Sequence, residues 1–365
     1  MAKPPIRRIG ILTGGGDCPG LNAVIRAVVK SAALKGVSVI GFRDAFLGLV
    51  NDVAQPLGSP DVSNILTRGG TMLGSSNKDN PFHLAEQDKH GKIHHRDRSG
   101  EIPKNLKKRG IDALVVLGGD GSMTVANRLS RMGVKIVGVP KTIDNDLMGT
   151  EQTFGHDTAV SIATEAIDRL HTVADSHHRV IIVEVMGRYA GWLALRSGLA
   201  GGGDVILIPE IPYEEQKVSE AIFSRQKSGK KSSIIVIAEG AHPKGGKMVV
   251  DRVTPLSEEK IRLGGVSRQL AHHLETKSKV ETRSVILGHI VRGGTPTAFD
   301  RILATQFGVK AMEMVMAVDF GRMVALQKGL MGSVALSKVG GKVRKVPVNH
   351  ELVGAARRIG VSFGI

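Results

Sequence analysis

One pattern constrains this 365-residue chain more than any other: short apolar runs alternate with glycine-rich turns and helix-like segments. The apolar run 9–12 is followed by a glycine-rich loop at 13–20 and a helix-like segment at 21–34. The pattern recurs at 112–117, where a second glycine-rich turn precedes a helix-like segment at 123–132. Such alternation is typical of parallel βαβ units, and the length suffices for about two domains. We therefore predict an α/β fold of two similar doubly wound, three-layer domains with parallel-type sheets.

Polar residues recur where the predicted strands end. Further strands are predicted at 37–42, 135–139, 179–185, 204–208, 233–238 and 283–287, and a long helix at 156–174. In open parallel sheets, ligands bind outside the carboxyl ends of the strands. The sequence therefore predicts a ligand site at that edge of the sheets. The polar segment 81–103 is predicted to be an excursion on the surface.

Composition and charge exclude several classes of protein. A single cysteine, Cys18, excludes an internal disulfide framework and a multi-cysteine zinc site. No apolar stretch approaches the roughly 18 residues of a membrane span, and residues 1–8 do not resemble a signal peptide, so we expect no membrane association and a cytoplasmic location. The net charge is +16, but aromatic residues make up only 3% of the chain. Because nucleic-acid-binding surfaces usually add aromatic residues to basic ones, nucleic acid is disfavoured as a partner; solvated basic faces or a polyanionic substrate explain the charge.

Two glycine-rich loops are candidates for binding phosphate. Small residues at 13–20 allow backbone N–H groups to converge on an anion, although the loop matches neither the Walker nor the dinucleotide fingerprint and a tight turn is the alternative. The second loop, 118–122, reads Gly-Gly-Asp-Gly-Ser and places Asp120 where a carboxylate can hold Mg²⁺. Diacylglycerol and NAD kinases share this pattern. By itself it indicates only a phosphoryl-donor site.

The segment 140–146 carries the carboxylates for proton transfer. Phosphoryl transfer to an alcohol needs a carboxylate near the attacking hydroxyl group to accept its proton. Asp144 and Asp146 alternate about Asn145 at the end of a predicted buried strand. One of them is a candidate general base, and the other is a candidate for facing the metal or for supporting the base.

Six ordered motifs between about residues 6 and 330 resemble the 6-phosphofructokinase family, both its bacterial ATP-dependent members and its mixed ATP and pyrophosphate group. They lie at 14–17, 68–71, 118–122, 142–146, 185–188 and 288–294. The resemblance implies transfer of a phosphoryl group to the 1-hydroxyl group of fructose 6-phosphate, which forms fructose 1,6-bisphosphate, with Mg²⁺ as cofactor. It also implies an active site in the cleft between two domains.

The resemblance further implies a role for each matching residue. Asp144 matches the catalytic base, with Asp146, Thr142 and Arg188 beside it in the catalytic group. The residues that match substrate contacts are Thr142, Ile143, Asp144, Arg179, Met186, Gly187, Arg188, Glu239, Arg283, His289 and Arg292. Those expected at the donor phosphates are Gly15, Gly16, Asn77, Lys78, Gly119, Asp120, Gly121 and Ser122, with Asp120 on the metal.

The same resemblance implies a domain division and an assembly. A donor-binding domain is expected at 1–155 plus about 291–341, and a sugar-phosphate domain at about 156–290 plus 342–365. Arg179 and Arg283 match arginines that reach into a neighbouring subunit's site. We therefore expect a homo-oligomer, a tetramer before a dimer, with shared active sites.

The sequence also departs from the family pattern. Asn77 stands where many bacterial members carry a donor-contacting arginine, residues 78–103 contain an insertion, and the effector site is matched only in part. The tail after residue 330 has no assigned role. Two donor signals conflict, because Gly121 is typical of ATP users and Lys141 of pyrophosphate users. We predict ATP as the donor, since a glycine at 121 leaves room for the α-phosphate, and keep pyrophosphate as the alternative.

Two further alternatives come from other classes of protein. A kinase of lipids or of NAD would share only the loop at 118–122. An inactive, basic nucleic-acid-binding protein could retain the fold without the chemistry. Arg188, His289 and Arg292 argue against the first, and intact Asp120 and Asp144 argue against the second.

Overall fold

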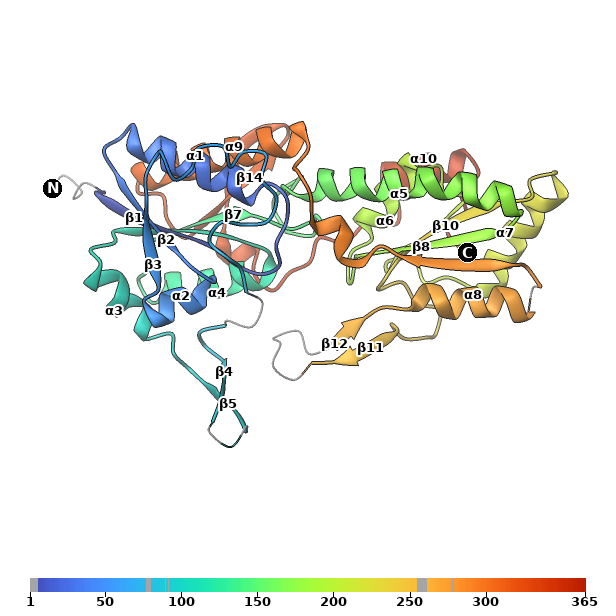
Figure 1. The fold of residues 1–365 in the computed structure, drawn as a ribbon, viewed down its shortest axis with the longest axis horizontal. Coiled ribbons are helices and arrows are strands. Elements are labelled where there is room, and N and C mark those ends of the chain that lie inside the picture. Colours follow the sequence, from blue (N-terminus) through green and yellow to red (C-terminus); the bar gives the residue numbers. More distant parts are fainter. Residues whose placement is uncertain (1–5, 77–79, 89, 91, 255–260, 278) are drawn as a thin grey trace.

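The computed structural model describes residues 6–76, 80–88, 90, 92–254, 261–277 and 279–365. They form two lobes that lie side by side along the long axis of the molecule (Figure 1). In each lobe a mainly parallel sheet lies between layers of helices. The predicted α/β class with two parallel-type sheets is therefore confirmed. The boundaries proposed for the two domains stay a prediction.

The first lobe contains a seven-stranded sheet in the order β15-β14-β7-β6-β1-β2-β3. Its inner strands pair in parallel, whereas β3 and β15 at the two edges run antiparallel to their neighbours. The strands are β1 (Arg8–Thr13), β2 (Ser38–Phe42), β3 (Ala54–Leu57), β6 (Ala113–Gly118), β7 (Ile136–Pro140), β14 (Arg322–Gln327) and β15 (Leu330–Ala335).

Helices cover both faces of this sheet. The helices α1 and α9 lie on one face and pack against each other, and α2, α3 and α4 lie on the other (Figure 1). Their bounds are α1 (Leu21–Ala33), α2 (Phe46–Asn51), α3 (Glu101–Lys108), α4 (Asp120–Arg131) and α9 (Ala298–Met316). The start of α4 differs from the predicted start at residue 123. Asp120 lies in the first helical turn, where the helix dipole favours an acidic side chain.

The second lobe contains a four-stranded parallel sheet in the order β13-β8-β10-β9. Its strands are β8 (Val180–Val185), β9 (Val205–Leu207), β10 (Ser233–Ala238) and β13 (Thr282–Ile286). Its helices are α5 (His156–His177), α6 (Trp192–Ala200), α7 (Glu215–Lys227), α8 (Val266–Lys277) and α10 (Glu351–Arg358). Figure 1 shows α5, α6 and α10 on one face and α7 and α8 on the other.

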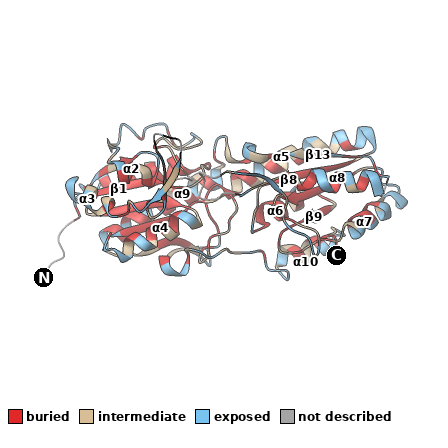
Figure 2. Ribbon diagram, turned by 90° about the horizontal axis from the view of Figure 1, so that it is seen from below, coloured by how far each residue is buried: buried red, intermediate tan, exposed pale blue. Residues whose placement is uncertain are grey.

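Burial explains the composition of the central strands. Every residue of β6, β8 and β10 is buried. A strand of a parallel sheet that helices cover on both faces meets no water, and a continuous apolar run such as Ile234–Ala238 is the expected sequence. Figure 2 shows buried strands, such as β1 and β8, in the centre of each lobe and exposed residues on the outer sides of the helices.

Two short antiparallel hairpins project from the same side of the molecule (Figure 1). One consists of β4 (Leu84–Gln87) and β5 (Ile93–Arg96), within the segment predicted to be a surface excursion. The second consists of β11 (Val250–Val253) and β12 (Ile261–Leu263) in the second lobe.

The tail after residue 341 connects the two lobes a third time. Val343 pairs with Leu147 in the first lobe, and Ser362 pairs with Val205 at the edge of the second sheet. Between these contacts, α10 packs on α6. The tail after residue 330, whose role the sequence left open, therefore contributes β15 to the first lobe, a connection between the lobes, and α10 to the second lobe. Within the described ranges, none of the helices combines the length and the apolar character needed to cross a bilayer.

Candidate active site

A cavity of about 650 Å³ lies between the lobes, at the carboxyl ends of their parallel strands. The loops after β1, β6 and β7 line it from the first lobe, and those after β8, β10 and β13 line it from the second. The ligand site predicted at this edge is therefore a single cleft. The predicted residues in its wall are Gly15, Gly16, Gly119, Gly121, Ser122, Lys141, Thr142, Asp144, Asp146, Met186, Arg188, Glu239, His289 and Arg292.

The two glycine-rich loops lie against each other on the first-lobe side of the cavity. The amide of Gly14 donates to the Leu117 carbonyl at 2.7 Å. A Cβ atom on Gly14 would lie 2.5 Å from the hydroxyl oxygen of Ser122, so a larger residue would push the loops apart. Their close contact leaves a wall of backbone and small side chains. Such a wall suits an anion that approaches main-chain N–H groups.

Lys141 brings a cation beneath these loops. Its side chain is buried, and Nζ donates to the carbonyl oxygen of Gly16 at 2.6 Å. Burial lowers the pKa of this ammonium group from its ordinary value. A bound phosphate would favour the charged form, because an opposite charge nearby offsets the loss of solvation.

The segment after β7 alternates between cavity and core. Thr142, Asp144 and Asp146 line the cavity, whereas Ile143 and Asn145 are completely buried. The backbone here is not a regular strand, because residues 143 and 144 form a bend and Asn145 has a left-handed φ of 53°. Both aspartates face the cleft. The side chain of Ile143 belongs to the core and is not in the cavity wall. Of this residue, only main-chain atoms could therefore make the predicted contact with the substrate.

Hydrogen bonds from three directions hold the aspartate loop in place. Asn145, at a left-handed φ of 53°, accepts a bond from the Thr153 amide at 2.9 Å through Oδ1. The Arg344 guanidinium of the tail donates to the Asn145 carbonyl at 2.8 and 3.1 Å and stacks 4.4 Å from the Trp192 ring centre. His156 Nδ1 donates to the Ile143 carbonyl at 2.6 Å, and burial lowers the pKa of His156 to about 3, so the ring is neutral.

Carboxylates crowd the floor of the cleft. Burial, together with the charge of Asp144, raises the pKa of Asp146 to about 7. Burial and the same charge raise the pKa of Glu239 to about 7. Groups with such perturbed pKa values in a cleft are typical of functional sites, and cations in the cleft would favour their charged forms.

The acidic groups near the donor loops suit Mg²⁺. Asp120 lies in the first turn of α4 between Gly119 and Gly121 of the cavity wall but does not itself line the cavity. It accepts a bond from the Gly341 amide at 2.7 Å and contributes to the raised pKa of Asp146. Carboxylate oxygens are ligands that Mg²⁺ prefers. The described residues form no cluster of three or more histidine, cysteine, aspartate or glutamate side chains that could hold a metal by themselves. This matches the usual binding of Mg²⁺ through one or two carboxylates, water and substrate phosphates.

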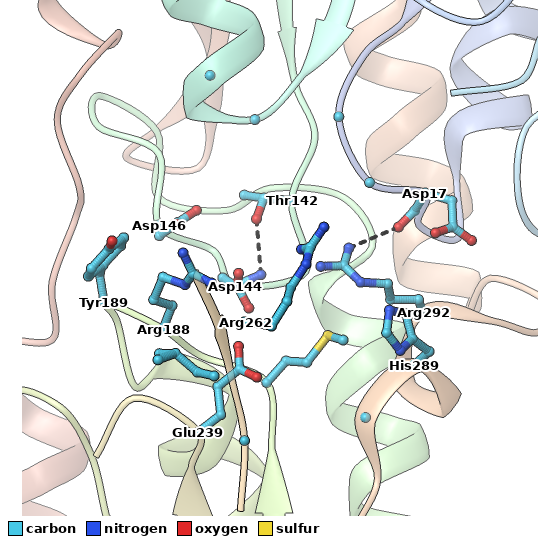
Figure 3. Close-up of a pocket in the computed structure, with 18 of the residues that line it drawn as sticks. Asp17, Thr142, Asp144, Asp146, Arg188, Tyr189, Glu239, Arg262, His289 and Arg292 are labelled. Carbon is cyan, nitrogen blue, oxygen red and sulfur yellow. Dashed lines mark hydrogen bonds between the residues drawn. The ribbon is translucent and has the colours of Figure 1, made fainter. Parts of the chain in front are cut away.

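Arg188, His289 and Arg292 line the second-lobe side and the end of the cleft (Figure 3). Arg188 donates to the main-chain carbonyl of Ile261 in β12. Arg292 donates to the carbonyl of Asp17 at 3.2 Å and so contacts the first glycine-rich loop. The side chains predicted for the two substrates therefore meet in one cleft. Gly187, between Met186 and Arg188, has a φ of 140° and is outside the cavity wall.

Arg179 and Arg283 are not part of this chain's cavity. Both arginines pair with Glu281, at 3.0 and 3.1 Å, and Arg283 also pairs with Glu275. They lie near the amino ends of β8 and β13, opposite the ends that line the cleft. A contact with a neighbouring subunit's site stays a prediction. Asn77 and Lys78 lie outside the described residues, and Ser76 and Asn80 beside them line the cavity.

Part of the cavity wall consists of residues that the sequence did not predict. The missed residues include Tyr189, Asp251, Arg252, Arg262 and Arg268. Three of these, Asp251, Arg252 and Arg262, lie on the β11–β12 hairpin, whose charged sequence resembles an ordinary solvated segment. The one available signal was the pair Gly264-Gly265, a glycine turn directly before a helix, as in the phosphate loops.

Three comparisons with known proteins agree with this geometry. Residues 8–315 match the model of the family described as phosphofructokinase. The chain is 54% identical to "ATP-dependent 6-phosphofructokinase 2" of Clostridium perfringens, over 98% of this chain and 99% of the relative. It is 49% identical to "pyrophosphate–fructose 6-phosphate 1-phosphotransferase" of Amycolatopsis mediterranei, over 94% and 97%.

A solved structure shares the fold. Phosphofructokinase from Saccharomyces cerevisiae superimposes with a TM-score of 0.77 at 29% identity, and the match covers 91% of this chain and 45% of the yeast chain. The family match extends over most of the chain and includes the glycine-rich loops, the aspartate loop and the arginines of the cleft. The chain therefore belongs to the phosphofructokinase family.

Proposed function

We propose that this chain transfers the γ-phosphoryl group of ATP to the 1-hydroxyl group of fructose 6-phosphate, forming fructose 1,6-bisphosphate and ADP. The observation that carries the proposal is the convergence of Asp144, the two glycine-rich loops and the arginines of the second lobe on one cavity. A donor and an acceptor bound on the two sides would meet at Asp144. Holding both reactants in this geometry is itself a large part of catalysis.

In the proposed reaction, Asp144 accepts the proton of the 1-hydroxyl group as its oxygen attacks the γ-phosphorus atom. The bond from that phosphorus to the β,γ-bridging oxygen breaks, and ADP leaves. The backbone of both glycine-rich loops and the Lys141 ammonium group would hold the donor phosphates. Asp120 and Asp146 would hold Mg²⁺, which supplies charge neutralisation at those phosphates.

The acceptor side is assigned to residues of the second lobe and the aspartate loop. Arg188 and Arg292 suit a phosphate group because a guanidinium can donate two parallel hydrogen bonds to it. Glu239 and His289 would bind sugar hydroxyl and phosphate oxygens, with Thr142 and Met186 lining the pocket around the ring.

Gly121 supports ATP as the donor. It lines the cavity in the first turn of α4, and a Cβ atom placed on it would meet no atom within 4 Å. That open space next to the donor loops leaves room for an α-phosphate and a nucleoside. Lys141 favours pyrophosphate as a second candidate, because its ammonium group already lies against the first loop. The two relatives named above, one of each kind, are 54% and 49% identical to this chain.

A donor comparison tests the proposal. With fructose 6-phosphate and Mg²⁺, we expect a kcat/KM for ATP that exceeds the value for pyrophosphate by at least tenfold. Formation of fructose 1,6-bisphosphate is measured through coupled aldolase, with the same enzyme preparation for both donors. Turnover with pyrophosphate but not with ATP would establish the second candidate. Failure with both donors would reject phosphoryl transfer to this acceptor.

We also propose that Arg179 and Arg283 complete the site of a neighbouring subunit in a homo-oligomer. Arg283→Ala is expected to raise the KM for fructose 6-phosphate by about tenfold or more, since it removes a charged hydrogen bond to phosphate. The matched control is Lys217→Ala, which removes a cation from an exposed ion pair on α7.

Subunit mixing distinguishes a shared site from a local effect. If Arg283 acts across an interface, hybrids of Arg283→Ala and Asp144→Asn subunits contain sites with both residues intact. Activity above that of either variant alone is then expected after subunit exchange. No recovery despite exchange, followed by native mass spectrometry, contradicts the shared site.

A further inference from the structure

The β11–β12 hairpin contributes a guanidinium to the cleft. Arg262, the middle residue of β12, lines the cavity and is half-buried. Its side chain extends from the hairpin into the cavity, in the same close-up as Asp144 and Arg292 (Figure 3). Arg252 of the facing strand is exposed and lies 3.9 Å from its neighbour Asp251. Arg252 also lines the cavity, directly opposite Arg262 in the hairpin, but it is the more exposed of the two.

The base of the hairpin is attached to the strand that leads to Arg188. Glu184 of β8 is 1% exposed, and its carboxylate accepts bonds from the Gly265 amide at 3.0 Å and from the Ser267 amide at 3.0 Å and hydroxyl at 2.6 Å. A buried carboxylate with three donors is a strong attachment. The first of these donors, Gly265, is three residues after Arg262. The hairpin base therefore has a defined position relative to β8.

A second link joins the hairpin to the acceptor side of the cleft. The Arg188 guanidinium donates to the carbonyl of Ile261, the residue before Arg262. Successive residues of a strand point to opposite faces, but their main chain is shared. The bond from Arg188 therefore also limits where the Arg262 side chain can lie.

The position of Arg262 places a positive charge where the substrates would bring negative charge. Lys141 and Arg292 of the cavity wall already donate to the carbonyls of Gly16 and Asp17 in the first loop. Arg179 and Arg283 lie outside this chain's cavity. Substrates of the proposed reaction carry phosphate groups with two or more negative charges, beside the carboxylates Asp144, Asp146 and Glu239. A further guanidinium in the cleft would offset part of this charge.

We propose that Arg262 binds a phosphate group of a substrate in the cleft. This inference rests on the proposed function, and it adds a binding residue from the hairpin to those of the family motifs. The phosphate is either the 6-phosphate of the sugar or the terminal phosphate of the donor. An arginine suits both, because its planar fork donates two hydrogen bonds to a tetrahedral oxyanion.

Three variants test the role of Arg262. Arg262→Ala removes the group, Arg262→Lys retains the charge without the fork, and Lys247→Ala removes an exposed cation that is outside the cavity wall, close before the hairpin. Loss of a charged hydrogen bond to phosphate corresponds to about a 10- to 100-fold change in affinity. We expect this change for Arg262→Ala, a smaller one for Arg262→Lys, and none for Lys247→Ala.

The two sources of phosphate give different results. A raised KM for fructose 6-phosphate, with weaker binding of that sugar alone by calorimetry, assigns Arg262 to the 6-phosphate. A raised KM for the donor, or a lower kcat with unchanged sugar binding, assigns it to the transferred phosphoryl group. Unchanged kcat, KM values and sugar binding in a folded Arg262→Ala protein overturn the proposal, as does an equal effect of Lys247→Ala.

The calorimetry also separates this inference from the proposed function. If the wild-type chain shows no turnover with either donor, the proposed function fails. Binding of fructose 6-phosphate to wild type and to Arg262→Ala can still be compared. Equal affinities in this comparison, and in the same comparison for ATP, would then overturn the role of Arg262, and a loss of sugar affinity confined to the variant would support it for the 6-phosphate.

Discussion

Asp144→Asn is expected to lower kcat by about a thousandfold, the usual range for loss of a general base. The KM for fructose 6-phosphate should change by less than about threefold, because the amide retains the size and the hydrogen-bonding reach of the carboxylate. The main-chain amide of Asp144 already donates to the Thr142 hydroxyl at 3.1 Å, and neighbouring bonds hold the loop, so the geometry should survive the substitution. Steady-state kinetics with both substrates varied measure the effect.

The control for this prediction is Asp251→Asn, which neutralises an exposed carboxylate in the wall of the same cavity. It should retain kcat within about twofold. A further readout is the titration of Glu239, whose raised pKa owes part of its shift to the charge of Asp144. In Asp144→Asn that pKa should move down from about 7, as followed by carboxyl-carbon NMR. Wild-type turnover by Asp144→Asn would exclude Asp144 as the base.

Gly121→Asp is expected to lower kcat/KM for ATP by about a thousandfold. A carboxylate about 4 Å from a phosphate charge costs roughly 4 kcal/mol at an effective dielectric constant near 20, and each 1.36 kcal/mol is a factor of ten. The space around Gly121 means that the variant should fold, since an added Cβ meets no atom within 4 Å. Lys141 would remain against the first loop. We therefore expect pyrophosphate to become the better donor.

Two other substitutions at the same position distinguish charge from size. Gly121→Asn adds the same volume without the charge, and Gly121→Ala adds only a methyl group. If charge controls the choice of donor, Asn should retain much more ATP turnover than Asp, and Ala should retain most of it. Equal losses for Asp and Asn would assign the effect to bulk. An unchanged preference for ATP in Gly121→Asp would remove Gly121 from donor selection.

Local sequence was enough to predict the framework of both lobes. Apolar runs such as 112–117 and 233–238 predicted buried parallel strands, because only a strand covered on both faces is apolar along its whole length. The glycine-rich loops and the alternation of Asp144 and Asp146 are also local features. They placed the first-lobe side of the cavity wall, since the carboxyl ends of parallel strands converge wherever such a sheet forms.

Only the tertiary structure revealed the residues whose position depends on distant contacts. Arg262 is in the cleft because Glu184, about 80 positions earlier in the chain, holds the base of its hairpin. Arg344 supports the aspartate loop because the tail returns to the first lobe beside Leu147. Ile143 is in the core although it lies between two residues of the cleft. Charged side chains have the same local sequence pattern on a solvated face and in a cleft. Long-range packing and charge alone decide between the two.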